Sequence, residues 1–209
     1  MRACLRLIVA LLLWTLAAPA QQPPPAPSKP ASSASLDLGA VTDGIYRNSF
    51  FGFTLKLPFG WVDRTDVMRD EPSSPAKAGT GEVLLAVFER PPEATGSTVN
   101  SAIVVAAESI SSYPELKNAA QYFEPINELT KSNGFTAINE PYEIPVDGMP
   151  IVRQDFRKKL NNATMHQSSL VALRKGYIVS FTFLAGSDDE VTQNLDYLRF
   201  GSARPTKQK

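Results

Sequence analysis

Three short turn candidates divide the second half of this chain into segments of equal length. The starts of successive pairs are 14 residues apart, and the pairs are Asp147-Gly148, Asn161-Asn162 and Lys175-Gly176. Asp-Gly is a strong signal for a two-residue hairpin turn, and the other two pairs are compatible with one. The spacing predicts a β-meander, a run of antiparallel strands joined by short turns, near residues 140–146, 149–160, 163–174 and 177–184.

Further strands are indicated upstream of the meander. Residues 51–57 alternate between apolar residues and small or polar ones, which predicts a half-buried strand that ends at Pro58. Residues 83–88 and 102–107 are apolar on both parities, a pattern typical of central strands that are buried on two faces. A sheet that contains such strands needs a covering layer on each side.

The first covering helix is indicated by a capping box, Ser112 with Glu115 three residues later. The apolar residues that follow at helical spacing are Leu116, Ala119, Phe123, Ile126 and Leu129. Asn133-Gly134 is the expected end of this helix. Pro125 lies inside the pattern, so the helix is expected to kink or restart there.

A second helix is indicated by Ser187 and Glu190, with Gly201 as its stop. Its apolar positions are Val191, Leu195 and Leu198. Two helices are thus available to cover the two faces of the sheet. The predicted fold class is α+β, an α/β/α sandwich whose central antiparallel sheet (the β-meander) is flanked by helices.

The N-terminal residues have the pattern of a secretory signal peptide. Arg2 and Arg6 supply positive charge, residues 7–16 are apolar, and Ala18-Pro19-Ala20 offers small residues to a signal peptidase. The alternative, an uncleaved membrane anchor, needs about 20 apolar residues, and this run is shorter. We therefore expect residues 1–20 to be removed and the protein to be exported, to the periplasm or the exterior.

The rest of the chain divides by composition into a Pro/Ser-rich linker (residues 21–43), one domain (44–202) and a polar tail (203–209). Cys4 precedes the apolar run, so it cannot serve as the lipid-modified cysteine that would follow one, and no lipid anchor is expected. Removal of residues 1–20 leaves no cysteine, so the mature domain would have no disulfide.

Composition also excludes classes of function. The 21 basic and 21 acidic residues balance, whereas a nucleic-acid-binding protein usually has a basic excess. One Cys and one His leave too few ligands for a zinc site or an iron–sulfur cluster, so no metal or cofactor is expected.

Residues Gly44–Trp61 contain the pattern G-x-Y-x-N-x-x-F-G-F-x-L-x-L-P-x-G-W. This resembles the opening strands of the PsbP-like family, named for the extrinsic PsbP subunit of photosystem II, whose fold is shared with the Ran-binding Mog protein of yeast. Residues 176–183, followed by a short helix, resemble the end of that domain. The resemblance implies a domain that binds other proteins and carries no shared catalytic residues. It favours a non-catalytic binding module of the cell envelope.

Two groups of residues are candidates for contact with a ligand or partner. The first is aromatic, and Tyr46, Phe51 and Trp61 either line an apolar groove or belong to the core. The second is basic and includes Arg153, Arg157 and His166. If a turn is centred on Asn161-Asn162, these three residues share one face of the sheet.

The same register places Asp155, His166 and Ser168 on that face, with Asp155 opposite Ser168 and Arg157 opposite His166. Asp, His and Ser together suggest a hydrolase. No G-x-S-x-G turn surrounds Ser168, so a solvated charged face is the favoured interpretation.

Three functions follow from these patterns. The favoured one is a binding module for an envelope or secreted protein. The second is a carrier of a small apolar ligand in a gap between the sheet and the kinked helix near Phe123 and Pro125, and the third is a hydrolase that uses His166. Surface loops are predicted at 63–82 and 91–100, and the longer one, 63–82, is a further candidate for contact.

Overall fold

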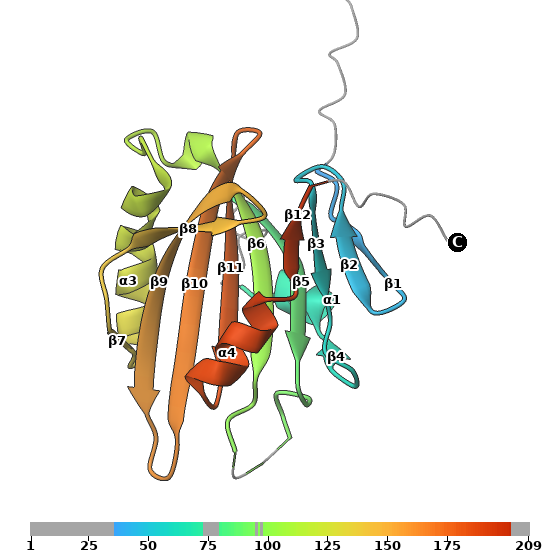
Figure 1. Ribbon diagram of the computed structural model, residues 1–209, viewed down its shortest axis with the longest axis vertical. Helices are drawn as coiled ribbons and strands as arrows, with labels where there is room; N and C mark the ends of the chain where they lie inside the picture. The colour runs from blue at the N-terminus through green and yellow to red at the C-terminus, as the bar shows by residue number, and fades with distance from the viewer. Residues whose placement is uncertain (1–35, 73–79, 95, 97, 202–209) are drawn as a thin grey trace, which may run out of the picture. The chain divides into compact units, whose positions relative to one another are not determined.

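The computed structural model describes residues 36–72, 80–94, 96 and 98–201. The predicted signal peptide, residues 21–35 of the predicted linker and the predicted tail lie outside these residues. The described chain forms two antiparallel sheets (Figure 1). The smaller sheet has the order β1 (Ala40–Thr42), β2 (Ile45–Asn48), β3 (Phe53–Lys56) and β12 (Leu198–Phe200).

The larger sheet contains the predicted meander. Its strands, in spatial order, are β4 (Val62–Asp63), β5 (Gly81–Phe88), β6 (Ala102–Ser109), β11 (Tyr177–Ala185), β10 (Thr164–Arg174), β9 (Met149–Lys159) and β7 (Thr136–Ala137), and β8 (Tyr142–Val146) also pairs with β9. Strands β8 to β11 confirm the meander, and all their pairings are antiparallel.

The turns of the meander explain its register. Asp147 and Gly148 have φ of 50° and 78°, and Lys175 and Gly176 have 49° and 80°. A positive φ at both central residues is the feature of the type I′ turn, whose twist matches that of the flanking strands. At the turn of Asn161-Asn162, the Leu160 N–H donates to the Ala163 carbonyl at 2.8 Å. The register of β9 with β10 is the predicted one.

The larger sheet is covered on both faces. On one face, a single core joins β2, β3 and β12 of the smaller sheet to the odd-numbered residues of β11, and α4 (Asp188–Leu195) packs there through Val191. The rings of Phe53 and Phe181 meet edge to face across this core, with centroids 5.0 Å apart. The predicted antiparallel sheet flanked by helices is confirmed. The separate smaller sheet was not predicted.

The opposite face carries a second apolar cluster. Tyr122 and Phe123 are buried there against Val152, Val171 and Ile178 of the sheet. They come from a helical layer made of two 3-10 turns, η1 (Ile110–Ser112) and η2 (Ala119–Tyr122), and the helix α3 (Phe123–Ser132). Strand β5 is buried from Val83 to Val87, as predicted for a strand covered on both sides. In β6 the even positions Val104 and Ala106 remain half-buried.

The first predicted helix is shorter than its sequence pattern. The capping box at Ser112 is wrong, since α3 begins at Phe123 and the capping side chain at η2 is Asn118, which accepts from the Gln121 N–H at 3.1 Å. Pro125 therefore lies in the first helical turn, where backbone N–H groups have no partner within the helix, and it causes no restart. The end at Asn133-Gly134 is confirmed, with Gly134 at φ 83°.

The second predicted helix is confirmed at its start. The Ser187 side chain accepts from the Glu190 N–H at 3.2 Å, as the capping box predicts. The helix ends at Leu195, earlier than Gly201, because Leu198 pairs with Leu55 of β3 instead.

Two further expectations are corrected. The boundary at residue 44 is too late, because β1 and the packed Leu36 and Leu38 belong to the folded unit, and the Tyr46 hydroxyl donates to the Leu38 carbonyl at 2.6 Å. The predicted loop at 63–82 contains a short helix, α1 (Thr65–Asp70), which packs against β5. Among the described residues no helix is both long and apolar enough to cross a bilayer.

Candidate functional site

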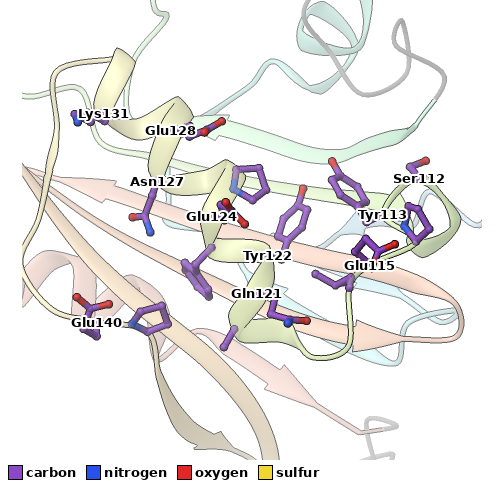
Figure 2. Close-up of a pocket in the computed structure, with 16 residues that line it drawn as sticks. Ser112, Tyr113, Glu115, Gln121, Tyr122, Glu124, Asn127, Glu128, Lys131 and Glu140 are labelled. Atoms are coloured by element: carbon purple, nitrogen blue, oxygen red, sulfur yellow. The ribbon is translucent and has the colours of Figure 1, made fainter.

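The helical layer carries a groove of about 820 Å³, which we call the helical groove (Figure 2). It runs along the segment from η1 to α3 and reaches the residues before β8. The aromatic and proline residues that line it are Tyr113, Pro114, Tyr122, Phe123, Pro125 and Pro141. The lining includes Phe123 and Pro125, where the sequence predicted a gap, but no strand of the large sheet contributes to it. The groove therefore lies in the helical layer and not between this layer and the sheet.

Two tyrosines form a rigid wall of the helical groove. The rings of Tyr113 and Tyr122 meet edge to face with centroids 5.1 Å apart, and Figure 2 shows them side by side. Both hydroxyls donate to Glu108 of β6, Tyr113 at 2.7 Å and Tyr122 at 2.5 Å. Burial and the neighbouring Glu108 carboxylate raise the pKa of both tyrosines, so the hydroxyls stay protonated and remain donors. The shared acceptor holds both rings in place.

The polar residues that line the helical groove are mainly acidic. Four carboxylates, from Glu115, Glu124, Glu128 and Glu140, lie around the groove with one ammonium group, that of Lys131. All five side chains are exposed. The groove thus combines an apolar aromatic wall with a negatively charged rim.

A second polar cluster lies on the other face of the sheet, around Asp155 of β9. Its carboxylate accepts from Arg153 Nε at 2.8 Å, from Asn139 at 2.8 Å and from Tyr142 at 3.1 Å, and Ser168 also donates to it. Burial by itself would raise the pKa of Asp155, but the hydrogen bonds from Ser168, Arg153 and Asn139 outweigh it and hold the pKa below its usual value. The cluster stabilises a charged carboxylate within the sheet.

His166, on β10, belongs to a different group, which centres on Asp188 at the start of α4. Its Nδ1 lies 2.7 Å from Asp188, which also accepts from Arg157 at 2.6 Å. Burial favours a higher pKa for Asp188, and the bonds from His166 and Arg157 reverse that effect and lower it. These contacts join β9 and β10 to the helix α4, so the three side chains have a structural role in holding the helix on the sheet.

The predicted strand register is confirmed, with Asp155 opposite Ser168 and Arg157 opposite His166. The three residues of the suspected hydrolase nevertheless fall into two groups. Ser168 donates to Asp155 and accepts from Arg153 at 3.0 Å, while His166 pairs with Asp188. A nucleophile needs a base within hydrogen-bond reach, and here the serine and the histidine are committed to other residues.

The aromatic candidates divide between the core and its margin. Tyr46 and Phe51 are 2% and 0% exposed, so they are core residues and have no surface to offer a partner. Trp61 is half-buried and packs against the same core. The interpretation of these rings as core, which the sequence left open, accounts for their positions.

Sequence reasoning missed the helical groove, although a local signal was present. Between residues 108 and 143 the acidic residues are Glu108, Glu115, Glu124, Glu128, Glu140 and Glu143, and the basic ones are Lys117 and Lys131. The balance over the whole chain concealed this excess. The pairing of Asp188 with His166 has no local signal in the sequence, because it depends on the position of α4 over the sheet.

No known family profile matches the chain, and no curated protein matches it. Several solved structures resemble it. The PsbP protein of the cyanobacterium Synechocystis (CyanoP) is 13% identical, with a TM-score of 0.49 over 84% of this chain and 99% of that one. The Ran-binding protein Mog1p of Saccharomyces cerevisiae is 13% identical, with a TM-score of 0.41 over 72% of this chain and 91% of that one.

A third similar structure is LpqN of Mycobacterium tuberculosis, described as involved in cell envelope biogenesis. It is 14% identical, with a TM-score of 0.39 over 71% of this chain and 83% of that one. PsbP and Mog1p are the two proteins to which the sequence resemblance pointed. At these identities the likeness concerns the fold alone.

Proposed function

We propose that this protein is an exported, non-catalytic binding protein that holds part of another envelope or secreted protein in the helical groove. The observation that carries the proposal is the preformed aromatic wall, in which Glu108 fixes Tyr113 and Tyr122 beside an open space of about 820 Å³. Tyrosine contributes large contact area at a low entropic cost, and rings that are already held in place reduce that cost further.

The hydrolase alternative receives less support. Ser168, Asp155 and Arg153 form one hydrogen-bonded group, and His166 with Asp188 forms another. The first group joins β9 to β10, and the second joins β10 to α4, so each has a role in stabilising the fold. The polar side chains around the helical groove are Tyr, Glu, Asn and Gln, with Ser112 and Lys131, and they suit recognition better than nucleophilic attack.

The second candidate, a carrier of a small apolar ligand, has one specific observation in its favour. The groove is lined by Phe123 and Pro125, as that hypothesis requires, and its volume falls within the range of about 300–1,000 Å³ that is usual for small-molecule sites. The acidic rim opposes it, because carboxylates add nothing to the binding of a neutral apolar molecule.

A variant with a blocked groove tests the proposal. Ala120 is exposed and lines the groove, so Ala120→Tyr adds bulk there without disturbing the core. The matched control is Ala94→Tyr, at an exposed position in a distant loop. Each tagged protein is cross-linked in its native envelope extract, and bound proteins are quantified by mass spectrometry against the wild type.

We expect Ala120→Tyr to lose at least nine-tenths of a specific protein partner, and Ala94→Tyr to retain it. Equal recovery of the partner by both variants would place its binding elsewhere on the protein and contradict the proposal. Co-purified lipid or another small apolar molecule that is lost only from Ala120→Tyr would favour the carrier instead.

Export is the remaining part of the proposal and rests on the pattern of Arg2, Arg6 and the apolar run before Ala20. Intact-mass measurement of the protein from its native envelope fraction is expected to give a chain that begins at Gln21. A protein that retains residues 1–20, or that is found only in the cytosol, would show this part to be wrong.

A further inference from the structure

We propose that the occupant of the helical groove is a basic peptide segment, an extended stretch of a partner protein that carries lysine or arginine between apolar residues. This inference rests on the proposed function and specifies the chemistry of the partner. Three features of the groove support it: its charge, its aromatic wall and the distribution of its carboxylates.

The charge of the groove selects the sign of the ligand. Four carboxylates and one ammonium group line it, whereas the whole chain has 21 residues of each sign. The excess is therefore a local property of this surface. Complementary charge across an interface accelerates encounter and suppresses wrong partners, so the groove should favour a cation and repel phosphates, nucleic acids and acidic peptides.

The aromatic wall fits the side chains that carry such a charge. Lysine and arginine have long apolar stems that pack on apolar surface while the charged head reaches outward. Tyr113 and Pro114 offer that surface, while Tyr122 is only 6% exposed and supports the Tyr113 ring from behind. The exposed Glu115 beside them offers an acceptor for the head. A cation can also lie over the face of a tyrosine ring. A strongly hydrated cation without apolar parts would gain nothing from this wall.

The carboxylates are spread along the groove. Glu124 and Glu128 lie one turn apart on α3, Glu115 lies between η1 and η2, and Glu140 precedes β8 (Figure 2). Within the described part of the chain no three acidic or histidine side chains come close enough together to hold a metal ion. Charges distributed in this way match several cations spaced along a peptide, and do not match one ion at a single point.

Charge reversal on α3 tests the inference. The probes are a fluorescein-labelled peptide that repeats Lys-Pro-Leu three times and its counterpart that repeats Glu-Pro-Leu. Binding is measured by fluorescence anisotropy with the mature protein and with the double variant Glu124→Lys/Glu128→Lys. A second variant, Glu124→Gln/Glu128→Gln, removes the charges with less effect on α3, and thermal melting checks that each protein is folded.

The matched control is Asp43→Lys/Glu71→Lys, which changes the net charge by the same amount outside the groove. Both residues are exposed, and Asp43 occupies a turn position whose φ of 52° is close to the 49° of Lys175, so lysine is compatible with it. This control separates binding in the groove from general attraction between the peptide and the protein.

We expect the wild type to bind the lysine peptide and not the glutamate peptide. The double charge reversal should weaken binding of the lysine peptide by about tenfold or more, the glutamine variant by less, and the control only slightly. Equal binding of both peptides, no binding of the lysine peptide, or equal weakening by the control would overturn the inference.

This result is distinguishable from a failure of the proposed function. If Ala120→Tyr abolishes capture of the envelope partner and the charge reversal leaves it intact, the groove is a protein-binding site and the basic peptide is wrong. If neither variant affects capture, the groove itself is the wrong site. Spermidine is added at the concentration that supplies the same number of positive charges as the peptide. If it displaces the lysine peptide, the groove binds a small cation and the inference is contradicted.

Discussion

Replacement of Phe53 by alanine is expected to lower the free energy of unfolding by about 3–5 kcal/mol, the usual cost of truncating a fully buried aromatic ring. Phe53 is 1% exposed and is one of the core residues through which the smaller sheet packs on the larger one. Its ring lies 5.0 Å from that of Phe181 and 5.9 Å from that of Phe200, measured between centroids. The substitution opens a cavity between two sheets that cannot easily collapse.

Denaturant unfolding followed by circular dichroism measures this loss, and Phe59→Ala is the matched control. Phe59 is fully exposed, so the same change in chemistry there should alter the stability by no more than about 0.5 kcal/mol. A loss of less than about 1 kcal/mol for Phe53→Ala would show that the two sheets do not share a core in solution.

Replacement of Asp155 by alanine is expected to cost about 3 kcal/mol at neutral pH, at the lower end of the range for breaking a buried ion pair. The change leaves the Arg153 guanidinium without its carboxylate, and Ser168, Asn139 and Tyr142 lose their shared acceptor. The Arg153 side chain remains 21% exposed, so water relieves part of the penalty.

The stabilisation by Asp155 should depend on pH in one direction. The folded protein holds the pKa of Asp155 below its usual value of 3.8, so the folded state binds a proton less readily than the unfolded chain does. The stabilising effect is then complete above about pH 4 and disappears as the pH falls through the folded-state pKa. Unfolding measured from pH 7 to pH 3 should show the stability gap between wild type and Asp155→Ala narrowing below about pH 4.

Asp188→Ala is the control for this substitution. Asp188 also accepts from basic side chains, Arg157 and His166, but its own side chain is 59% exposed. Ion pairs that are open to water contribute about 1 kcal/mol or less. Equal losses for Asp155→Ala and Asp188→Ala would show that burial does not set the two clusters apart.

Local patterns predicted much of the larger sheet. The turns at Asp147-Gly148 and Lys175-Gly176 place both central residues at positive φ, which Gly adopts freely and Asp tolerates, and the turn spacing then determines strand length and register. The start of α4 was predictable for a similar reason, since the Ser187 cap involves only residues that are three positions apart. The first helix was predicted too long because apolar residues continue at helical spacing through 116–122. There the chain forms only the 3-10 turn η2, which Asn118 caps.

The sequence by itself determined the meander, its register, the two-sided burial of β5 and the cap of α4, because each depends on neighbours along the chain or on a single short turn. Only the tertiary structure decided that Leu198 pairs with Leu55, that Asp188 meets His166, and that Glu140 lines the helical groove. These contacts join segments that are distant in sequence. They arise from the way apolar faces pack together, and no local pattern of residues specifies which faces meet.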